Sequence, residues 1–256
     1  MANVKKLMYI SPIGYSFLDD QIKSYILKYV ENCTVCATSL AKAPYHLEYL
    51  YYSALIAPEL LNKIKQAEID GFDAAIIGCF YDPFLYEARE MSDKLVVTAP
   101  CEASLSVAVK LGASFSIIVG RRKMIPYMEE NVRKYGFENK LASFRSVELG
   151  VLDFQDKKDL AEERILREAE RAVKEDGAEV IVLGCTKEFG FFQEVQDKLG
   201  VPVIDSMIAA CKEAEFLVSC KNMLNWTTSK VGAYETPKDS EIRQWKLDQY
   251  FQIPMK

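Results

Sequence analysis

The stretch DGFDAAIIGC at residues 70–79 occurs again, 106 residues later, as DGAEVIVLGC at residues 176–185. In each copy a short apolar run ends in a Gly-Cys step. Such a run is typical of a strand that is buried on both faces, in a parallel sheet covered by helices on both sides. Two copies in a single chain therefore predict two similar lobes related by an approximate two-fold axis.

The rest of the chain continues this alternation of strands and helices, which predicts an α/β fold. We expect two pseudo-two-fold-related lobes, each a parallel sheet covered by helices, with the active site in the cleft between them. The first lobe is expected to comprise residues 1–99 plus 206–256, and the second residues 100–205. One helix is expected to begin near Asp159, which forms a capping-box pattern with Glu162. The predicted strands are Leu7–Ile13, Thr34–Leu40, Ala74–Phe80, Leu95–Ala99, Phe115–Gly120, Arg145–Gly150, Val180–Gly184 and Val201–Asp205.

Composition excludes several classes of function. The 256 residues carry a net charge of -5 and no stripe rich in Lys and Arg, which argues against a nucleic-acid partner. No apolar segment approaches the length of a membrane helix, and the run Leu7 to Ile10 is too short for a signal peptide, so we expect a cytoplasmic protein. Seven scattered cysteines and a single histidine predict neither a disulfide framework nor a metal site.

The repeated cysteines carry the chemistry. Cys79 and Cys185 each follow the carboxyl end of a predicted buried strand, where open α/β sheets bind their ligands. There we expect each thiol at the start of a helix, whose N–H groups and dipole favour a thiolate. Two opposed thiols could remove a proton from a carbon next to a carbonyl and return one to the opposite face. The other five cysteines are interpreted as structural: Cys33, Cys36, Cys101, Cys211 and Cys220.

With these motifs the chain resembles the aspartate/glutamate racemase superfamily, and within it the hydantoin racemase group. The similarity rests on AIIGCFYDP at residues 75–83, EARE at residues 87–90, GAEVIVLGC at residues 177–185 and VPVID at residues 201–205. It implies a two-thiol mechanism on Cys79 and Cys185 that needs no metal, pyridoxal phosphate or other cofactor, and a small-molecule substrate. Phe80 and Thr186 match positions whose backbone amides and hydroxyls hold the substrate's carbonyl or carboxylate.

Other positions of the resemblance differ from the hydantoin group, which indicates a changed substrate pocket. Ser11, Pro12 and Ile13 stand where that group has an Asn-Pro-Asn-Thr segment, and Val119-Gly120, followed by Arg121, stands where it carries two threonines. The candidate substrate-binding residues at these two places are Ser11, Pro12, Ile13, Gly120 and Arg121. Arg121 or Arg122 could clamp a carboxylate, or both could lie on a solvated loop. Glu48 and Asp82 are candidates for residues that support the site from behind, Glu102 and Asp205 are weaker ones, and His46 is interpreted as a surface residue.

Three functions remain open from the sequence. The first is a racemase or epimerase that inverts a stereocentre next to a carbonyl, in a hydantoin-like ring or an amino-acid derivative. The second is a cysteine-dependent cis–trans isomerase or decarboxylase of a small dicarboxylate, and the third is an inactive small-molecule binder. We also expect a homo-oligomer, which the polar C-terminal residues 226–256 could support as a surface helix or as an arm.

Overall fold

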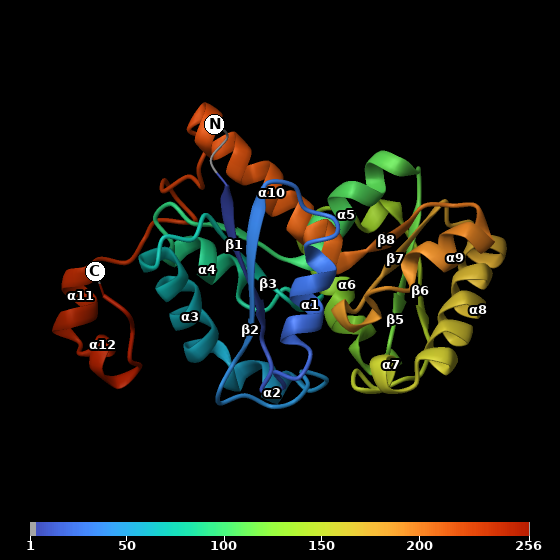
Figure 1. Cartoon of the computed structure of the whole chain (residues 1–256), viewed down its shortest axis with the longest axis horizontal. Helices are drawn as coiled ribbons and strands as arrows, with labels where there is room; N and C mark the ends of the chain where they lie inside the picture. Colours follow the sequence, from blue (N-terminus) through green and yellow to red (C-terminus); the bar gives the residue numbers. More distant parts are fainter. Residues whose placement is uncertain (1–3, 256) are drawn as a thin grey trace. The chain divides into compact units, whose positions relative to one another are not determined.

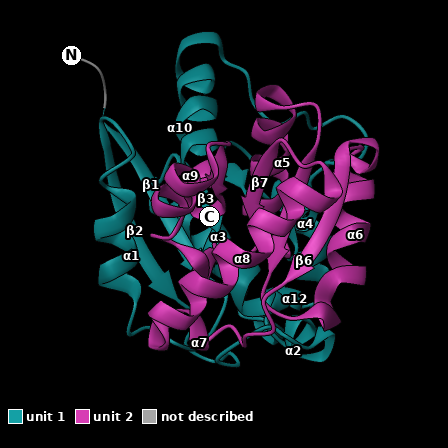
Figure 2. Ribbon diagram, turned by 90° about the vertical axis from the view of Figure 1, so that its right-hand side faces the viewer, with its two compact units in different colours: residues 1–77, 83–98, 211–256 teal, residues 78–82, 99–210 magenta. Residues whose placement is uncertain are grey.

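The computed structural model describes residues 4–255, which form two compact units (Figure 2). Unit 1 contains the chain up to Ile77, the segment Pro83–Thr98 and the chain from Cys211 onward. Unit 2 contains Gly78–Asp82 and Ala99–Ala210. The turn that carries Cys79 therefore belongs to unit 2, although the strand before it belongs to unit 1.

Unit 1 is built on a parallel four-stranded sheet in the order β2-β1-β3-β4. The register places Leu7 of β1 opposite Ala74 of β3, and Ala75 of β3 opposite Val97 of β4. All four side chains of β3 are buried, as the absence of polar alternation predicts. The strands are β1 (Lys5–Ser11), β2 (Cys33–Ser39), β3 (Ala74–Ile77) and β4 (Val96–Thr98).

Unit 2 repeats this sheet with the order β6-β5-β7-β8, again all parallel. The central pair β5 and β7 places Phe115 opposite Val180, the counterpart of the pairing in unit 1. Its strands are β5 (Phe115–Val119), β6 (Leu141–Ser146), β7 (Val180–Leu183) and β8 (Val203–Asp205). The two sheets have the same strand order, which confirms the α/β fold with two similar parallel sheets (Figure 1).

Helices connect the strands and cover the sheets in both units. Unit 1 holds α1 (Asp19–Ile26), α2 (Leu50–Leu55), α3 (Ala57–Ile69) and α4 (Leu85–Met91). Unit 2 holds α5 (Pro100–Leu111), η1 (Arg122–Met124), α6 (Ile125–Lys134), η2 (Glu138–Lys140), α7 (Asp153–Asp156), α8 (Lys158–Asp176), η3 (Thr186–Glu188) and α9 (Phe192–Leu199). The last long helix, α10 (Ser206–Leu224), begins in unit 2 and continues into unit 1.

The core of unit 2 shows why α8 lies where it does. Its apolar stripe, from Ala161 through Ile165 and Ala169 to Ala172, packs against one face of the sheet. Ile181 and Leu183 of β7 point into this cluster together with Ile118 of β5 and Val195 of α9. Residues three or four apart lie on one side of α8, and alternate residues of β7 lie on one face of the sheet. These two apolar surfaces pack against each other.

Two local predictions are wrong. The strand expected at Arg145–Gly150 lies earlier, at Leu141–Ser146. It is the edge strand β6, and all its residues are partly exposed, so it lacks the continuous apolar run that marks a buried strand. The apolar Val147 and Leu149 that suggested the later bounds are buried beyond the strand's end, in the α8 core. Asp159 does not cap α8, which begins at Lys158 without a side-chain cap.

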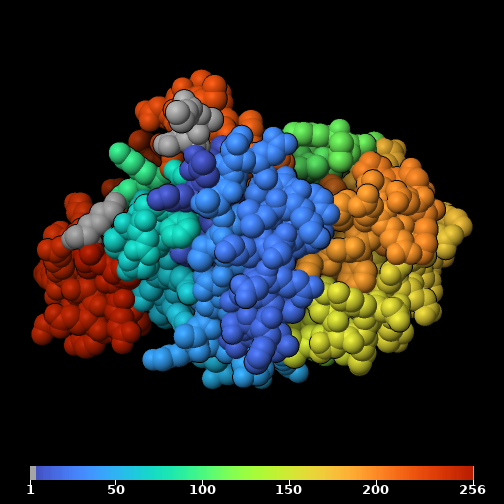
Figure 3. All heavy atoms as spheres, in the orientation of Figure 1, coloured from blue at the N-terminus to red at the C-terminus, as the bar shows by residue number. Residues whose placement is uncertain are grey.

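The C-terminal residues 226–255 belong to unit 1 and carry two short helices, α11 (Asp239–Gln244) and α12 (Leu247–Tyr250), rather than one. Figure 3 shows these residues on the surface beside α3, and Asn62 of α3 donates a hydrogen bond to the carbonyl of Phe251 at 2.6 Å. Lys230 donates to the last carbonyls of α4, those of Arg89 at 2.7 Å and Glu90 at 3.1 Å. No helix in residues 4–255 is long and apolar enough to cross a membrane.

Truncating Ile165 to alanine tests the packing of α8. Because Ile165 is fully buried, Ile165→Ala should lower the free energy of unfolding by about 2–5 kcal/mol, measured by urea denaturation. Glu163→Ala on the exposed face of the same helix is the matched control and should change it little. Equal effects of the two substitutions would contradict the assigned face.

Candidate active site

Cys79 and Cys185 occupy equivalent places in the two sheets. Each lies two residues beyond a central strand, Cys79 after β3 and Cys185 after β7, and each keeps partial exposure. Both cysteines belong to unit 2. The negative charge of an ionised Cys79 would raise the pKa of Cys185.

The turns around the two cysteines repeat the same hydrogen bonds. The backbone N–H of Tyr81 donates to the sulfur of Cys79, and that of Lys187 donates to the sulfur of Cys185 at 3.4 Å. One residue further on, the N–H of Asp82 donates to the carbonyl of Cys79 at 3.0 Å, and the N–H of Glu188 to that of Cys185 at 2.9 Å. Each thiol is thus held by a tight turn that offers its sulfur one backbone donor.

Burial nevertheless raises the pKa of both thiols, which corrects the expectation of thiols activated by helix starts. The pKa of Cys79 rises to about 12, and that of Cys185 rises well above its ordinary value. The physical reason is that no long helix begins directly after either cysteine, so helix N–H groups do little to stabilise a thiolate there. Helix α4 begins only at Leu85, and Cys185 is followed by the three-residue turn η3. One N–H donor therefore does not offset the loss of solvation.

A hydrogen bond ties the two turns together. The hydroxyl of Thr186 donates to the carbonyl of Gly78 at 3.0 Å, across 108 residues of chain. Thr186 is buried, so this contact is shielded from water. It joins the residue after Cys185 to the residue before Cys79 and thereby fixes the two thiols relative to each other within unit 2.

Asp82 anchors the Cys79 turn to α5. Its carboxylate accepts the N–H groups of Cys101 and Glu102, both at 2.8 Å, and the hydroxyl of Tyr135 at 2.9 Å. The two N–H groups are free donors at the start of α5, so Asp82 caps this helix from outside. Burial raises the pKa of Asp82 to about 7, against the lowering effect of its three donors.

Asn131 is a supporting residue that the sequence analysis missed. Its side chain on α6 donates to the carbonyl of Tyr81 at 2.8 Å. Together with Tyr135, it holds the Cys79 turn from the side of α6. No sequence pattern marks it, because the contact joins residues 50 positions apart.

Lys187 and Glu188 are two further residues that were not assigned from the sequence. Only 6% of Lys187 is exposed, and Glu188 is fully buried. The carboxylate of Glu188 accepts the N–H of Cys185 at 3.2 Å, and the side chain of Gln155 donates to the carbonyl of Lys187 at 2.7 Å. The signal that could have found them is the charged pair itself, which directly follows a buried strand and its Gly-Cys step.

Several residues that the sequence assigned to the site belong to unit 1, whereas both cysteine turns belong to unit 2. Ser11, Pro12 and Ile13 are buried at the end of β1, and Glu48 is buried beside His46; all of them belong to unit 1, and their role in binding stays a prediction. In unit 2, Phe80 is only 2% exposed, so its ring belongs to the core and only its backbone could serve a ligand.

Gly120 and Arg121 follow β5 in unit 2. The carbonyl of Gly120 accepts the Ser146 hydroxyl at 3.0 Å and the N–H of Leu149 at 3.1 Å. A side chain at Gly120 would meet the carbonyl oxygen of Leu149 at 2.8 Å, so glycine is required by the close approach of the neighbouring backbone. Arg121 is partly exposed, and the adjacent Arg122 is exposed and pairs with Glu148 at 3.7 Å.

The five remaining thiols differ in their exposure. Cys101, Cys211 and Cys220 are buried in helices, as expected for structural residues. Cys33 is partly exposed, whereas Cys36 on β2 is exposed and does not fit that interpretation. Among residues 4–255, no group of three or more Cys, His, Asp or Glu side chains could hold a metal ion.

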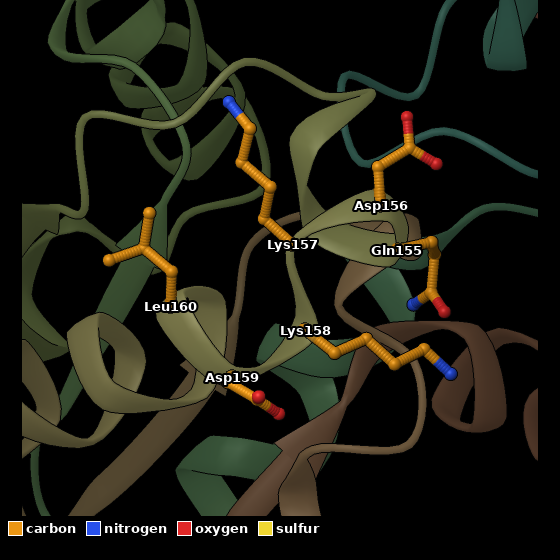
Figure 4. Close-up of a pocket in the computed structure, with 6 residues that line it drawn as sticks. All are labelled: Gln155, Asp156, Lys157, Lys158, Asp159 and Leu160. Atoms are coloured by element: carbon orange, nitrogen blue, oxygen red, sulfur yellow. The ribbon is translucent and has the colours of Figure 1, made fainter.

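A polar depression of about 490 Å³ lies at the junction of α7 and α8. The residues that line it do not belong to the two cysteine turns. Figure 4 shows its lining residues, Gln155, Asp156, Lys157, Lys158, Asp159 and Leu160. Gln155 is the link to the cysteines, since its amide donates to the carbonyls of Lys187 at 2.7 Å and Phe189 at 3.4 Å. Gln155 therefore braces the Cys185 turn from the side of α7.

Removal of the Asp82 carboxylate should loosen the Cys79 turn. Asp82→Ala leaves three donors without their acceptor, so we expect a loss of about 2–4 kcal/mol in the free energy of unfolding, measured in urea. Tyr135→Phe removes one of the three donors and should cost about 1 kcal/mol. Asp159→Ala on the exposed start of α8 is the control and should change stability little. A loss for Asp82→Ala no larger than that of Tyr135→Phe would contradict the capping role.

Comparisons with known proteins agree with this architecture. The family model of Asp/Glu/hydantoin racemases matches residues 21–214. A hydantoin racemase of Paenarthrobacter aurescens is 34% identical over 92% of this chain and 99% of its own, and one of Rhizobium meliloti is 36% identical over 85% and 88%. The structure of an allantoin racemase from Klebsiella pneumoniae superposes with a TM-score of 0.86 at 29% identity, over 92% of this chain and 94% of its own. The chain belongs to the Asp/Glu/hydantoin racemase family.

Proposed function

We propose that this protein is a cofactor-independent racemase that inverts a stereocentre next to a carbonyl, with Cys79 and Cys185 as the two groups that exchange protons with the substrate carbon. The observation that carries the proposal is the repeated turn. Two thiols stand at equivalent ends of two central strands and share one compact unit, and the bond from Thr186 to Gly78 links their turns.

The substrate class that we propose is a hydantoin ring substituted at carbon 5, which includes allantoin. The relatives named above act on such rings, and the similarity to them spans nearly the whole chain. The carbon-bound hydrogen of these rings lies next to a carbonyl, so its removal gives an enolate that hydrogen-bond donors can stabilise. The backbone N–H groups of the two cysteine turns are the candidates for that role.

The reaction conserves charge and protons over one turnover. One cysteine, as thiolate, takes the proton from the carbon and becomes a thiol, and the charge moves to the enolate. The other cysteine gives its proton to the opposite face of the carbon and becomes the thiolate. The reverse reaction starts from this second state, so no cofactor is consumed.

Substitution of either cysteine tests the two-thiol proposal. We expect Cys79→Ser and Cys185→Ser each to lower kcat for a 5-substituted hydantoin by at least about 10³-fold, because a serine hydroxyl is a much weaker acid than a thiol and does not ionise to supply the base. Polarimetry measures the rate, and proton NMR in heavy water should show one deuterium at the inverted carbon per turnover. Cys36→Ser, at an exposed thiol in unit 1, is the control and should keep full activity.

Near-normal racemisation by either variant would exclude the two-thiol reaction. Deuterium incorporation with loss of carbon dioxide, or a covalent adduct on Cys79 seen by mass spectrometry, would indicate the decarboxylase or the isomerase instead.

The pH profile provides a separate test. One thiol must lose its proton before catalysis, and burial raises the pKa of both, so kcat/KM should rise with pH through the neutral and mildly alkaline range. Below the pKa the rise is about tenfold per pH unit. A raised folded-state pKa also means that stability falls once pH exceeds the ordinary thiol pKa, so circular dichroism must confirm folding at each pH. A profile that is flat from pH 6 to 9 would contradict a thiolate base.

A further inference from the structure

Helix α2 of unit 1 has its apolar side chains turned outward; it lies at the lower end of that unit in Figure 1. Of its six described residues only the polar Ser53 is buried, whereas Leu50, Tyr51 and Leu55 are exposed. A helix on the surface of a globular protein normally does the reverse and turns its apolar stripe toward the core. An outward apolar face of this kind indicates a surface that is made for contact.

The apolar surface extends beyond this helix. No exposed residue in the described segment 43–58 carries a charge, and Glu48, its acidic residue, is buried. Ring contacts connect the segment to the loop after β1, because the ring centroid of Tyr15 lies 5.3 Å from that of Phe17 and 5.9 Å from that of Tyr45. We call this surface the aromatic face; its large exposed residues are Phe17, Tyr45, Tyr49, Leu50, Tyr51 and Leu55.

The size of the aromatic face suits a protein partner. Phe17 is 86% exposed, Tyr51 70%, Tyr45 61% and Tyr49 42%. Since one aromatic side chain can bury about 150–250 Å², these four residues alone expose roughly 400–650 Å². The largest apolar patch on an ordinary monomer is about 300–600 Å². With its two leucines added, the aromatic face approaches the area of about 800 Å² that each partner buries in a stable interface.

The charge pattern favours a second copy of this chain as the partner. A membrane-binding surface needs lysines or arginines around its apolar residues, and a partner of opposite charge needs charged residues to meet; the segment 43–58 exposes neither. Two copies with a net charge of -5 each repel one another, and this repulsion opposes contact least where the surface is uncharged. A two-fold axis brings the same patch of both copies together, so the patch must be compatible with itself, as uncharged aromatic and apolar side chains are.

The C-terminal helices α11 and α12 offer a less suitable surface. Trp245, Tyr250 and Phe251 are exposed there, but Arg243 and Lys246 are exposed in the same segment. An interface on this segment would have to remove charged groups from water, and charged residues are depleted at the centres of protein interfaces. The aromatic face carries no such cost.

We propose that the aromatic face is the contact between two copies of this chain, which pair about a two-fold axis so that α2 of each copy packs against the aromatic face of the other. The pairing removes the exposed rings and leucines of both copies from water, which is the driving force of most protein association. The aromatic face belongs to unit 1 and both cysteine turns belong to unit 2, so this inference goes beyond the proposed function and does not depend on it.

Sedimentation equilibrium of the full chain tests the proposal. The wild-type protein should form a dimer, or a larger assembly built from dimers, at micromolar concentration. Tyr51→Glu should raise the dissociation constant of the dimer at least about 100-fold, because aromatic anchors carry much of the energy of an interface and each substitution counts twice about a two-fold axis. Tyr250→Glu, at an equally exposed tyrosine of the same unit, is the matched control and should leave the constant unchanged. Circular dichroism confirms that both variants fold.

Hydrogen exchange of the unaltered protein is the second arm and stands even where a variant fails to fold. Amide exchange in residues 43–58 should slow when the protein concentration rises through the dissociation constant, whereas exchange in residues 239–251 should stay the same. A wild-type protein that remains monomeric at about 100 µM would overturn the proposal, since an interface of this size should be occupied there. A dimer that Tyr51→Glu leaves intact would overturn it too, and dissociation by Tyr250→Glu alone would place the contact on the C-terminal helices instead.

Discussion

The hydrogen bond from the hydroxyl of Thr186 to the carbonyl of Gly78 is the contact on which the arrangement of the two thiols depends. It joins the loop after β7 to the loop after β3, although these strands belong to different sheets. The segment Gly78–Asp82, which accepts this bond, is part of unit 2 and not of the unit that contains its own strand. Both cysteines of a chain with two equivalent sheets therefore lie in one compact unit.

The surroundings of this bond show how the fold supports the two cysteine turns. In the Cys79 turn, Asp82 accepts two N–H groups from the start of α5 and the hydroxyl of Tyr135, which directly follows α6. The side chain of Asn131 on α6 donates to the carbonyl of Tyr81 in the same turn. In the Cys185 turn, the side chain of Gln155 on α7 donates to the carbonyl of Lys187. Each brace comes from a different element and ends on a backbone or carboxyl group beside a cysteine. Reactive side chains need such support because small displacements of the reacting groups reduce the rate steeply.

Electrostatics then set the chemical character of the site. Burial alone would keep both sulfurs protonated, as the raised pKa values show. The proposed racemisation needs a base on one side of the carbon and an acid on the other, so one of the two thiols must ionise while the other keeps its proton. The charged residues of the two turns differ, because the buried Lys187 stands in the Cys185 turn where Tyr81 stands in the Cys79 turn.

The sequence by itself determined the α/β class, the existence of eight strands and the equivalence of Cys79 and Cys185, because apolar runs and a repeat of 106 residues are local or periodic features. It misplaced β6, since an edge strand lacks a continuous apolar run. It also assumed low thiol pKa values from helix starts, whereas α4 begins only at Leu85 and the turn η3 after Cys185 has three residues. Only the tertiary structure decided that both thiols share one unit, that Asp82 caps α5, and that Asn131 and Gln155 hold the turns. These are contacts between residues far apart in the chain, and burial, which sets the pKa of a thiol, is a property of the folded surroundings and not of the residue or its neighbours in sequence.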